Sequence, residues 1–143
     1  MGRIPINFFS EEIEFSLKQK GLVRNWIRNT ILDEKHQLRL LNFIFCSDSY
    51  LLNINRQYLN HDTYTDIITF DNSDNELDIL GDVFISIDRI LENAKELQLN
   101  EIDELHRVMI HGTLHLLGYT DKTKAAKALM TEKEDLYLSK RSL

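Results

Sequence analysis

The chain has 143 residues, of which 43% are hydrophobic and 28% are charged, and its net charge is −6. This composition is typical of a soluble globular protein, and the length predicts one domain, residues 1–143, with a real core. No apolar run approaches the ~20 residues that span a bilayer, so we expect no membrane segment. The single cysteine, Cys46, excludes an internal disulfide and favours a cytoplasmic location.

The charge is distributed unevenly along the chain. Residues 1–40 contain seven Lys and Arg against five acids, a surplus of +2, so the remainder carries −8. The overall negative charge argues against nonspecific binding of nucleic acid. Any contact with phosphate groups therefore has to come from a local basic patch.

Hydrophobic periodicity predicts an alternating order of strands and helices. We expect a strand at 4–9, a helix at about 20–33, a strand at 38–46, a helix from Ser47 or Asp48 to about 58, strands at 66–71 and 79–87, and three helices, from Ser86 or Asp88 to about 97, from Asn100 to Gly118, and at about 122–138. This order predicts an α+β fold: a single four-stranded mixed sheet covered by helices, one of them buried. The residues 60–63 are polar and predict a loop.

The helix at about 20–33 is amphipathic. Its predicted core face contains Leu22, Val23, Trp26, Ile27, Ile31 and Leu32. Lys20, Arg24 and Arg28 repeat at four-residue spacing on the other side of this helix.

The residues 105–121 carry the strongest functional signal. This segment is apolar at most positions, which predicts a helix buried on nearly every side. His111 and His115 are four residues apart, so their side chains differ by only ~40° around the helix and can face one point. Gly118 ends the helix, because glycine takes the left-handed conformation cheaply, and the reversal lets Asp121 return to that point.

Two imidazoles and one carboxylate leave one position open on a tetrahedral ion, as in a catalytic zinc site. A His-x3-His pair alone is more often a coincidence than a metal site, but an unpaired imidazole in an apolar segment is costly. We therefore predict one zinc ion per chain, held by His111, His115 and Asp121. Two alternatives remain for Asp121: it caps the last helix, or it orients a ligand histidine while water is the third ligand.

The spacing also matches a metalloprotease pattern, His-Glu-x-x-His-x-x-Gly-x-x-His. Gly112 stands in the place of the glutamate that serves as general base in those enzymes. Glycine cannot accept a proton from water, so we expect no peptidase activity.

The same residues resemble the YbeY family of metal-dependent endoribonucleases, which mature ribosomal RNA in bacteria. The family motif is His-Gly-x-Leu-His-Leu-x-Gly-Tyr-Asp-His, and this chain agrees from His111 to Tyr119, then has Thr120-Asp121 where Asp-His is usual. From about residue 40 onward, shorter matches occur at Asn55, Tyr58, Thr65, Asp66, Phe70, 80–86, Met130 and Glu134. The resemblance implies the same fold and a zinc endoribonuclease whose partners are ribosomal RNA or ribosomal subunits.

One departure concerns the RNA contact. The family commonly has an arginine, thought to meet RNA, directly after the position of Tyr58, where this chain has Leu59. Arg56 is a candidate to supply the positive charge that Leu59 lacks. The alternative, that Arg56 is a surface residue without a role in RNA binding, is equally favoured. For Arg24 and Arg28 we slightly favour a solvated face over contact with RNA.

Two further histidines, His61 and His106, and two alternative functions remain. His61 is a candidate for acid–base work, whereas His106 points ~140° away from His111 on a regular helix and is not an expected ligand. The alternatives to the endoribonuclease are a non-catalytic ribosome-assembly factor whose zinc stabilises the C-terminal helix, and a metal hydrolase of another substrate.

Overall fold

The computed structural model describes residues 3–61 and 63–142; Met1, Gly2, Leu143 and Asp62, which belongs to the predicted loop at 60–63, lie outside it. Within these residues the elements follow the predicted order, and the α+β class is confirmed. They are β1 (Ile6–Glu11), α1 (Lys20–Asp33), β2 (Gln37–Cys46), α2 (Asp48–Tyr58), β3 (Ile67–Asp71), β4 (Asp78–Ser86), α3 (Ile87–Leu97), α4 (Glu101–Leu116) and α5 (Lys124–Ser139).

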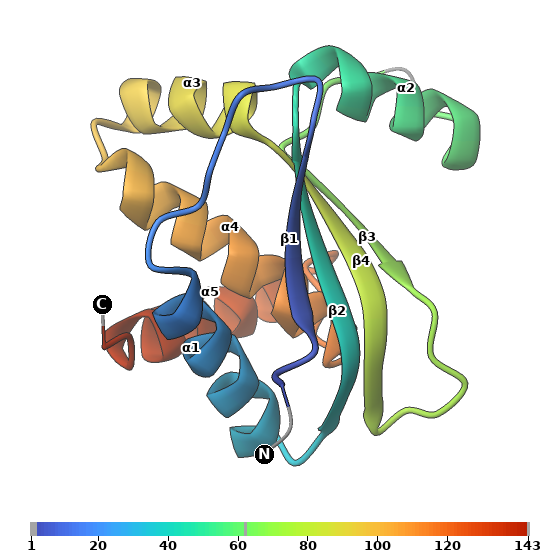
Figure 1. Ribbon diagram of the computed structural model, residues 1–143, viewed down its shortest axis with the longest axis vertical. Coiled ribbons are helices and arrows are strands. Elements are labelled where there is room, and N and C mark those ends of the chain that lie inside the picture. The colour runs from blue at the N-terminus through green and yellow to red at the C-terminus, as the bar shows by residue number, and fades with distance from the viewer. Residues whose placement is uncertain (1–2, 62, 143) are drawn as a thin grey trace.

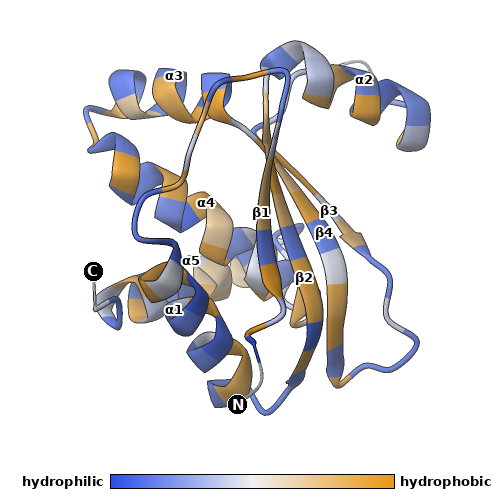
Figure 2. Cartoon of the chain, in the orientation of Figure 1, coloured by the Kyte–Doolittle hydropathy of each residue, from blue (hydrophilic) through white to orange (hydrophobic). Residues whose placement is uncertain are grey.

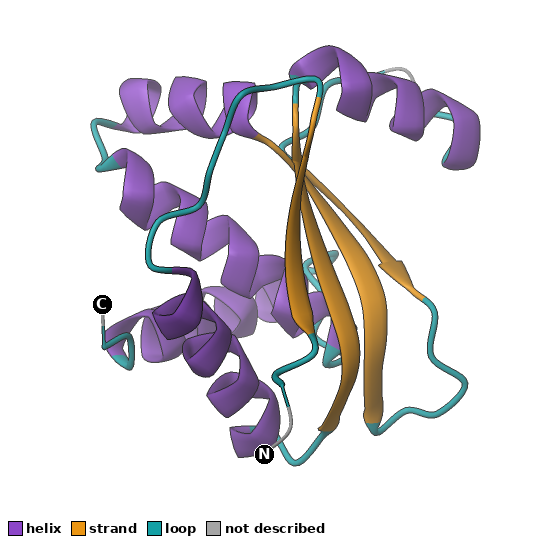
Figure 3. Ribbon diagram, viewed as in Figure 1, coloured by secondary structure: helices purple, strands orange, loops and turns teal. Residues whose placement is uncertain are grey.

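The four strands form one mixed sheet in the order β1-β2-β4-β3 (Figure 3). The pairs β1–β2 and β2–β4 are parallel, and β3 runs antiparallel to β4. Pro5 directly precedes β1, an edge strand, where its missing N–H costs no ladder hydrogen bond. The predicted four-stranded mixed sheet is therefore confirmed.

The two faces of the sheet are covered unequally. Helices α1, α4 and α5 lie on one face, and α2 lies on the other near one end of the strands (Figure 1). Alternation along β4 explains this, since Ile79, Val83 and Ile85 point into the main core while Phe84 packs beside α2. Figure 2 shows the corresponding hydrophobic residues along the strands and on α4.

Helix α4 is the buried helix that the sequence predicts. Its Gly112 faces the sheet so closely that an added Cβ would lie 2.8 Å from Cδ1 of Ile67 and 2.9 Å from Cγ1 of Val83. A glutamate at this position would point into β3 and β4 instead of toward solvent. The missing protease glutamate therefore has a packing reason as well as a chemical consequence.

The predicted core face of α1 was too wide. Leu22 and Leu32 are 43% and 53% exposed, whereas Val23, Trp26 and Ile31 are buried. The buried positions follow a stripe at spacings of three and four residues. At ~100° per residue, Leu22 lies ~110° from the centre of that stripe and Leu32 ~170° from it. Both leucines therefore lie outside the core face, and Leu32 lies nearly opposite to it.

Local capping predictions were correct. Ser47, Ser86 and Asn100 each accept hydrogen bonds from backbone N–H groups in the first turn of α2, α3 and α4. Cys46 is buried, and burial together with nearby acids raises the pKa of its thiol to about 12, which leaves it unreactive.

Within the part of the chain that the structure covers, no helix is both long enough and apolar enough to cross a membrane.

Candidate metal centre

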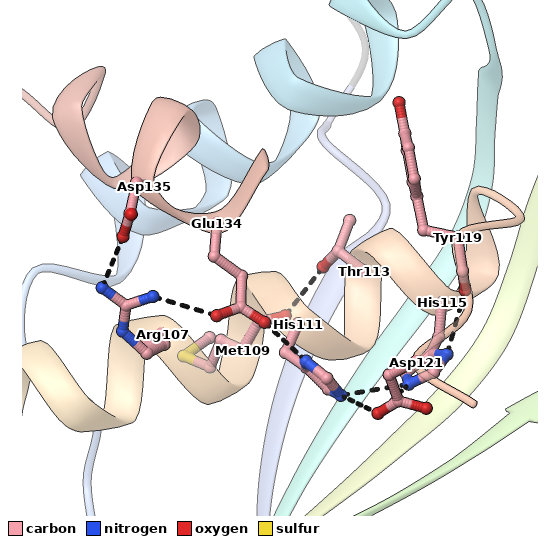
Figure 4. A network of polar contacts seen from close by, with 9 residues as sticks. All are labelled: Arg107, Met109, His111, Thr113, His115, Tyr119, Asp121, Glu134 and Asp135. Atoms are coloured by element: carbon pink, nitrogen blue, oxygen red, sulfur yellow. Dashed lines mark hydrogen bonds and ion pairs between the residues drawn. The ribbon is translucent and has the colours of Figure 1, made fainter. Parts of the chain in front are cut away.

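The end of α4 and the turn after it bring three side chains together. Gly118, with φ 104°, takes the left-handed conformation that the sequence predicts. The N–H of Gly118 donates to the carbonyl of His115 at 3.0 Å, and the N–H of Tyr119 donates to that of Leu114 at 3.0 Å. These bonds close the helix end and reverse the chain, so that Asp121 returns to His111 and His115 (Figure 4).

The three potential ligand atoms lie at mutual distances suited to a metal ion. Nε2 of His111 is 3.0 Å from Nε2 of His115, and Oδ2 of Asp121 is 3.4 Å and 3.6 Å from these nitrogens. A tetrahedral ion with bonds of about 2.0–2.1 Å places neighbouring ligand atoms about 3.3–3.4 Å apart. The separations therefore fit a single ion bound between them.

The Nδ1 partners fix which ring nitrogens offer lone pairs. Nδ1 of His111 lies 2.6 Å from a carboxylate oxygen of Glu134, and Nδ1 of His115 lies 3.1 Å from the carbonyl oxygen of Tyr119. Both partners accept, so each Nδ1 donates its hydrogen and each neutral Nε2 carries a lone pair. Two lone pairs and a carboxylate oxygen that face one another are compatible with a metal ion bound between them.

The two histidines differ in their affinity for a proton. Burial disfavours the charged ring of His111, but the hydrogen bond and the charge of Glu134 outweigh it and raise the pKa of this histidine. Burial and the charge of His111 lower the pKa of His115. Without a metal ion, the first proton is therefore held by His111.

Glu134 is a site residue to which the sequence analysis assigned no role. It lies on α5, is buried, and receives a hydrogen bond of 2.9 Å from Nη1 of Arg107, whose Nη2 contacts Asp135 at 2.8 Å (Figure 4). A carboxylate behind a ligand histidine fixes its ring and increases its basicity. One feature of the sequence could have indicated this role: Glu134 is an acid four residues after Met130, so both lie on the same, buried face of α5.

Thr123, and not Asp121, caps α5. Its hydroxyl accepts a hydrogen bond of 3.0 Å from the N–H of Ala126. The capping alternative for Asp121 is therefore excluded. The alternative in which Asp121 orients a histidine has weak support, because both Nδ1 atoms already face other acceptors.

Comparison with known proteins supports the sequence resemblance over almost the whole chain. The family model described as Endoribonuclease YbeY matches residues 5–142. The chain belongs to the YbeY family. The match begins far earlier than the motifs from about residue 40 indicated, so the N-terminal strand and helix are part of the family fold.

Relatives and a solved structure agree with this assignment. An Endoribonuclease YbeY of Cytophaga hutchinsonii is 52% identical over 136 residues, 95% of each chain. One of Amoebophilus asiaticus is 45% identical over 138 residues, 96% of this chain and 94% of the relative. The solution structure of a Thermotoga maritima protein is 27% identical with a TM-score of 0.67, covering 94% of this chain and 87% of the other.

The three arginines singled out in this YbeY family member lie on α1 and α2, not on the helix that carries His111 and His115. Nε of Arg24 donates to the carbonyl of Ile6 at 2.8 Å, and its guanidinium lies 5.0 Å from the ring centre of Phe8. Arg24 therefore binds β1, at the sheet edge opposite to β3, instead of projecting freely into solvent. Arg28 is half-buried on the same helix, and Arg56 lies on the last turn of α2.

The two remaining histidines have different surroundings. His61 lines an open cleft of about 390 Å³ together with Ile67 and Thr69, the β3 side chains that face Gly112 of the metal-site helix. His106 is buried against Trp26, and its Nδ1 accepts a hydrogen bond of 2.8 Å from Arg141. His61 thus shares a cleft with β3 residues that contact α4, while His106, as expected, is not among the clustered residues.

Proposed function

We propose that this chain is a single-domain, zinc-dependent endoribonuclease that cuts single-stranded ribosomal RNA during ribosome maturation and quality control in the cytoplasm. Its relatives are named Endoribonuclease YbeY. The observation that carries the proposal is the meeting of two histidine lone pairs and one carboxylate oxygen within 3.6 Å of one another.

We assign one zinc ion per chain to this point, with His111, His115 and Asp121 as its ligands. Two nitrogen donors and one carboxylate are a typical catalytic zinc set, and nitrogen donors favour zinc over magnesium or calcium. When bound, the ion supplies a Lewis acid that polarises a phosphate oxygen or a water molecule. Asp121 stands in the place of the family's third histidine and offers an anionic oxygen where the histidine offers a neutral nitrogen.

The exposure of the ligand side chains favours catalysis over a purely structural role. The side chains of His111, His115 and Asp121 are 21%, 28% and 41% exposed. A structural zinc site is closed by four protein ligands, whereas this arrangement leaves a side open to solvent and thus to a phosphate group. The non-catalytic assembly factor is therefore the weaker alternative.

The surrounding residues hold the ligands in their binding form. Glu134 and the Tyr119 carbonyl accept from Nδ1, so the Nε2 atom of each neutral ring carries the lone pair, and Arg107 holds Glu134 in place. For RNA contact, Arg56 is the best placed of the three arginines, because Asn55 and Leu59 on either side of it in the sequence line the cleft beside β3. We retain Arg24 and Arg28 as weaker candidates.

The decisive experiment combines metal analysis with RNA cleavage. Untagged protein should contain about one zinc per chain and cut single-stranded ribosomal RNA, and a chelator should stop the cleavage until zinc is restored. His115→Ala should lose both properties, while Glu132→Ala, on the exposed side of α5, should keep both. Protein that cannot be loaded with zinc would contradict the proposal.

Other outcomes identify the alternative functions. Tight zinc binding without cleavage of any RNA would indicate the assembly factor. Zinc-dependent hydrolysis of nucleotides or peptides, without RNA cleavage, would indicate another metal hydrolase.

RNA binding is tested separately by affinity at several salt concentrations. Arg56→Ala should weaken binding and reduce the salt dependence if this residue meets phosphate. The double variant Arg24→Glu with Arg28→Glu should weaken RNA binding only if these two arginines face RNA. Its folding must be verified, because Arg24 also binds β1. Unchanged affinity in all variants would remove these arginines from the RNA contact.

A further inference from the structure

A half-buried carboxylate outside the metal centre joins three parts of the chain. Glu34, at the C-terminal end of α1, accepts a hydrogen bond of 2.6 Å from the hydroxyl of Tyr119 on Oε1. Its Oε2 accepts a hydrogen bond from the hydroxyl of Tyr137 on α5 and lies 3.5 Å from Nζ of Lys133. The proposed function uses none of these side-chain contacts.

Tyr119 connects this cluster directly to the metal centre. Its hydroxyl is bound by Glu34, and its backbone carbonyl accepts the hydrogen bond from Nδ1 of His115 at 3.1 Å. Figure 4 shows the ring pointing away from Asp121 and the two histidines while the carbonyl lies beside His115. Glu34 therefore holds the side chain of Tyr119, and the backbone carbonyl of Tyr119 orients His115.

The turn that contains Tyr119 needs such an anchor. Gly118 has no side chain, and nothing lies within 4 Å of the place where its Cβ would be. Asp121, two residues after Tyr119, has a side chain 41% exposed. The exposed part of this turn is therefore held through Tyr119, whose ring packs against the core and whose hydroxyl is bound by Glu34.

We propose that Glu34 is a positioning residue of the metal centre: by binding the Tyr119 hydroxyl, it fixes the carbonyl that orients His115 and the turn that presents Asp121. This inference rests on the proposed metal site. The burial of Glu34 opposes its charge, but the tyrosine hydroxyls and Lys133 outweigh burial and lower the pKa of its carboxyl, which keeps it an ionised acceptor at neutral pH.

The two tyrosines provide a matched test. Tyr119→Phe and Tyr137→Phe each remove one hydroxyl from the same carboxylate, but only Tyr119 contacts a ligand histidine. Zinc affinity, measured by competition with a chelator, should fall about tenfold in Tyr119→Phe, the lower end of the loss seen for partners behind metal ligands. It should stay within about twofold of the wild type in Tyr137→Phe, although both variants lower the melting temperature of the metal-free protein.

A second variant and a spectrum keep the test conclusive if Tyr119→Phe folds poorly. Glu34→Gln keeps an acceptor for one hydroxyl and should bind zinc more tightly than Glu34→Ala. The absorption bands of bound cobalt should shift in Tyr119→Phe and Glu34→Ala but not in Tyr137→Phe. Equal zinc affinity in Tyr119→Phe, Glu34→Ala and wild type, or equal losses in both tyrosine variants, would overturn the inference.

The result is independent of RNA cleavage. If the wild type binds zinc but cuts no RNA, the proposed function fails, while the order of zinc affinities still tests Glu34. If the wild type cuts RNA and all variants bind zinc equally, the positioning role fails and the proposed function stands.

Discussion

Glu134 on α5 and His111 on α4, 23 residues apart in the sequence, are joined by a contact of 2.6 Å between Oε2 and Nδ1. This contact directs the Nε2 lone pair of His111 toward His115 and Asp121. Since Arg107 binds the other oxygen of Glu134, the orientation of the ligand histidine depends on the packing of α5 against α4.

Replacing Glu134 by glutamine should weaken metal binding. Glu134→Gln keeps the size of the side chain but removes the charge that stabilises the Nδ1 hydrogen of His111, so zinc affinity should fall about 10- to 100-fold. Titration against a chelator measures this. Glu132→Gln, on the same helix and exposed, is the control and should bind zinc like the wild type.

Asp121 should behave as a ligand in its own variants. Asp121→Asn should reduce zinc affinity sharply with little change in helix content, because Thr123 and not Asp121 caps α5. Asp121→His should retain the metal, since it restores the family's ligand. Thr123→Ala is the counterpart: it should cost about 1 kcal/mol of stability and keep the zinc. Wild-type zinc affinity in Asp121→Asn would show that the third ligand lies elsewhere.

Gly112 should not tolerate a side chain. Gly112→Ala places a methyl group under 3.0 Å from Ile67 and Val83, which should lower the free energy of unfolding by about 1–3 kcal/mol. The matched control is Gly21→Ala in α1, where nothing lies within 4 Å of the new Cβ and alanine should stabilise the helix by up to ~1 kcal/mol. Urea unfolding of the metal-free proteins measures both. A Gly112→Ala protein as stable as wild type would contradict the observed packing.

His106 should make stability depend on pH. Burial and the charge of Arg141 lower the pKa of His106 from 6.5 to about 4. Between these values the unfolded chain binds more protons than the folded one, so stability is complete above pH 6.5 and decreases as the pH falls toward 4. After allowance for solvent screening, the loss is on the order of 2 kcal/mol. Urea unfolding of wild type and His106→Gln across this range should show a shallower slope in the variant; equal slopes would assign the effect to other groups.

The sequence by itself determined the features that depend on near neighbours. The order of strands and helices follows from local periodicity, and Ser47, Ser86 and Asn100 cap helices through bonds to residues two or three positions away. The pairing of His111 with His115 belongs to the same class, because four residues make about one helical turn.

Tertiary structure decided the contacts between elements. Nothing local places Glu134 behind His111, or Glu34 on the Tyr119 hydroxyl across 85 residues of sequence. Periodicity defines a helix and its apolar side, but the packing of several such sides against one sheet determines which polar groups meet at their borders.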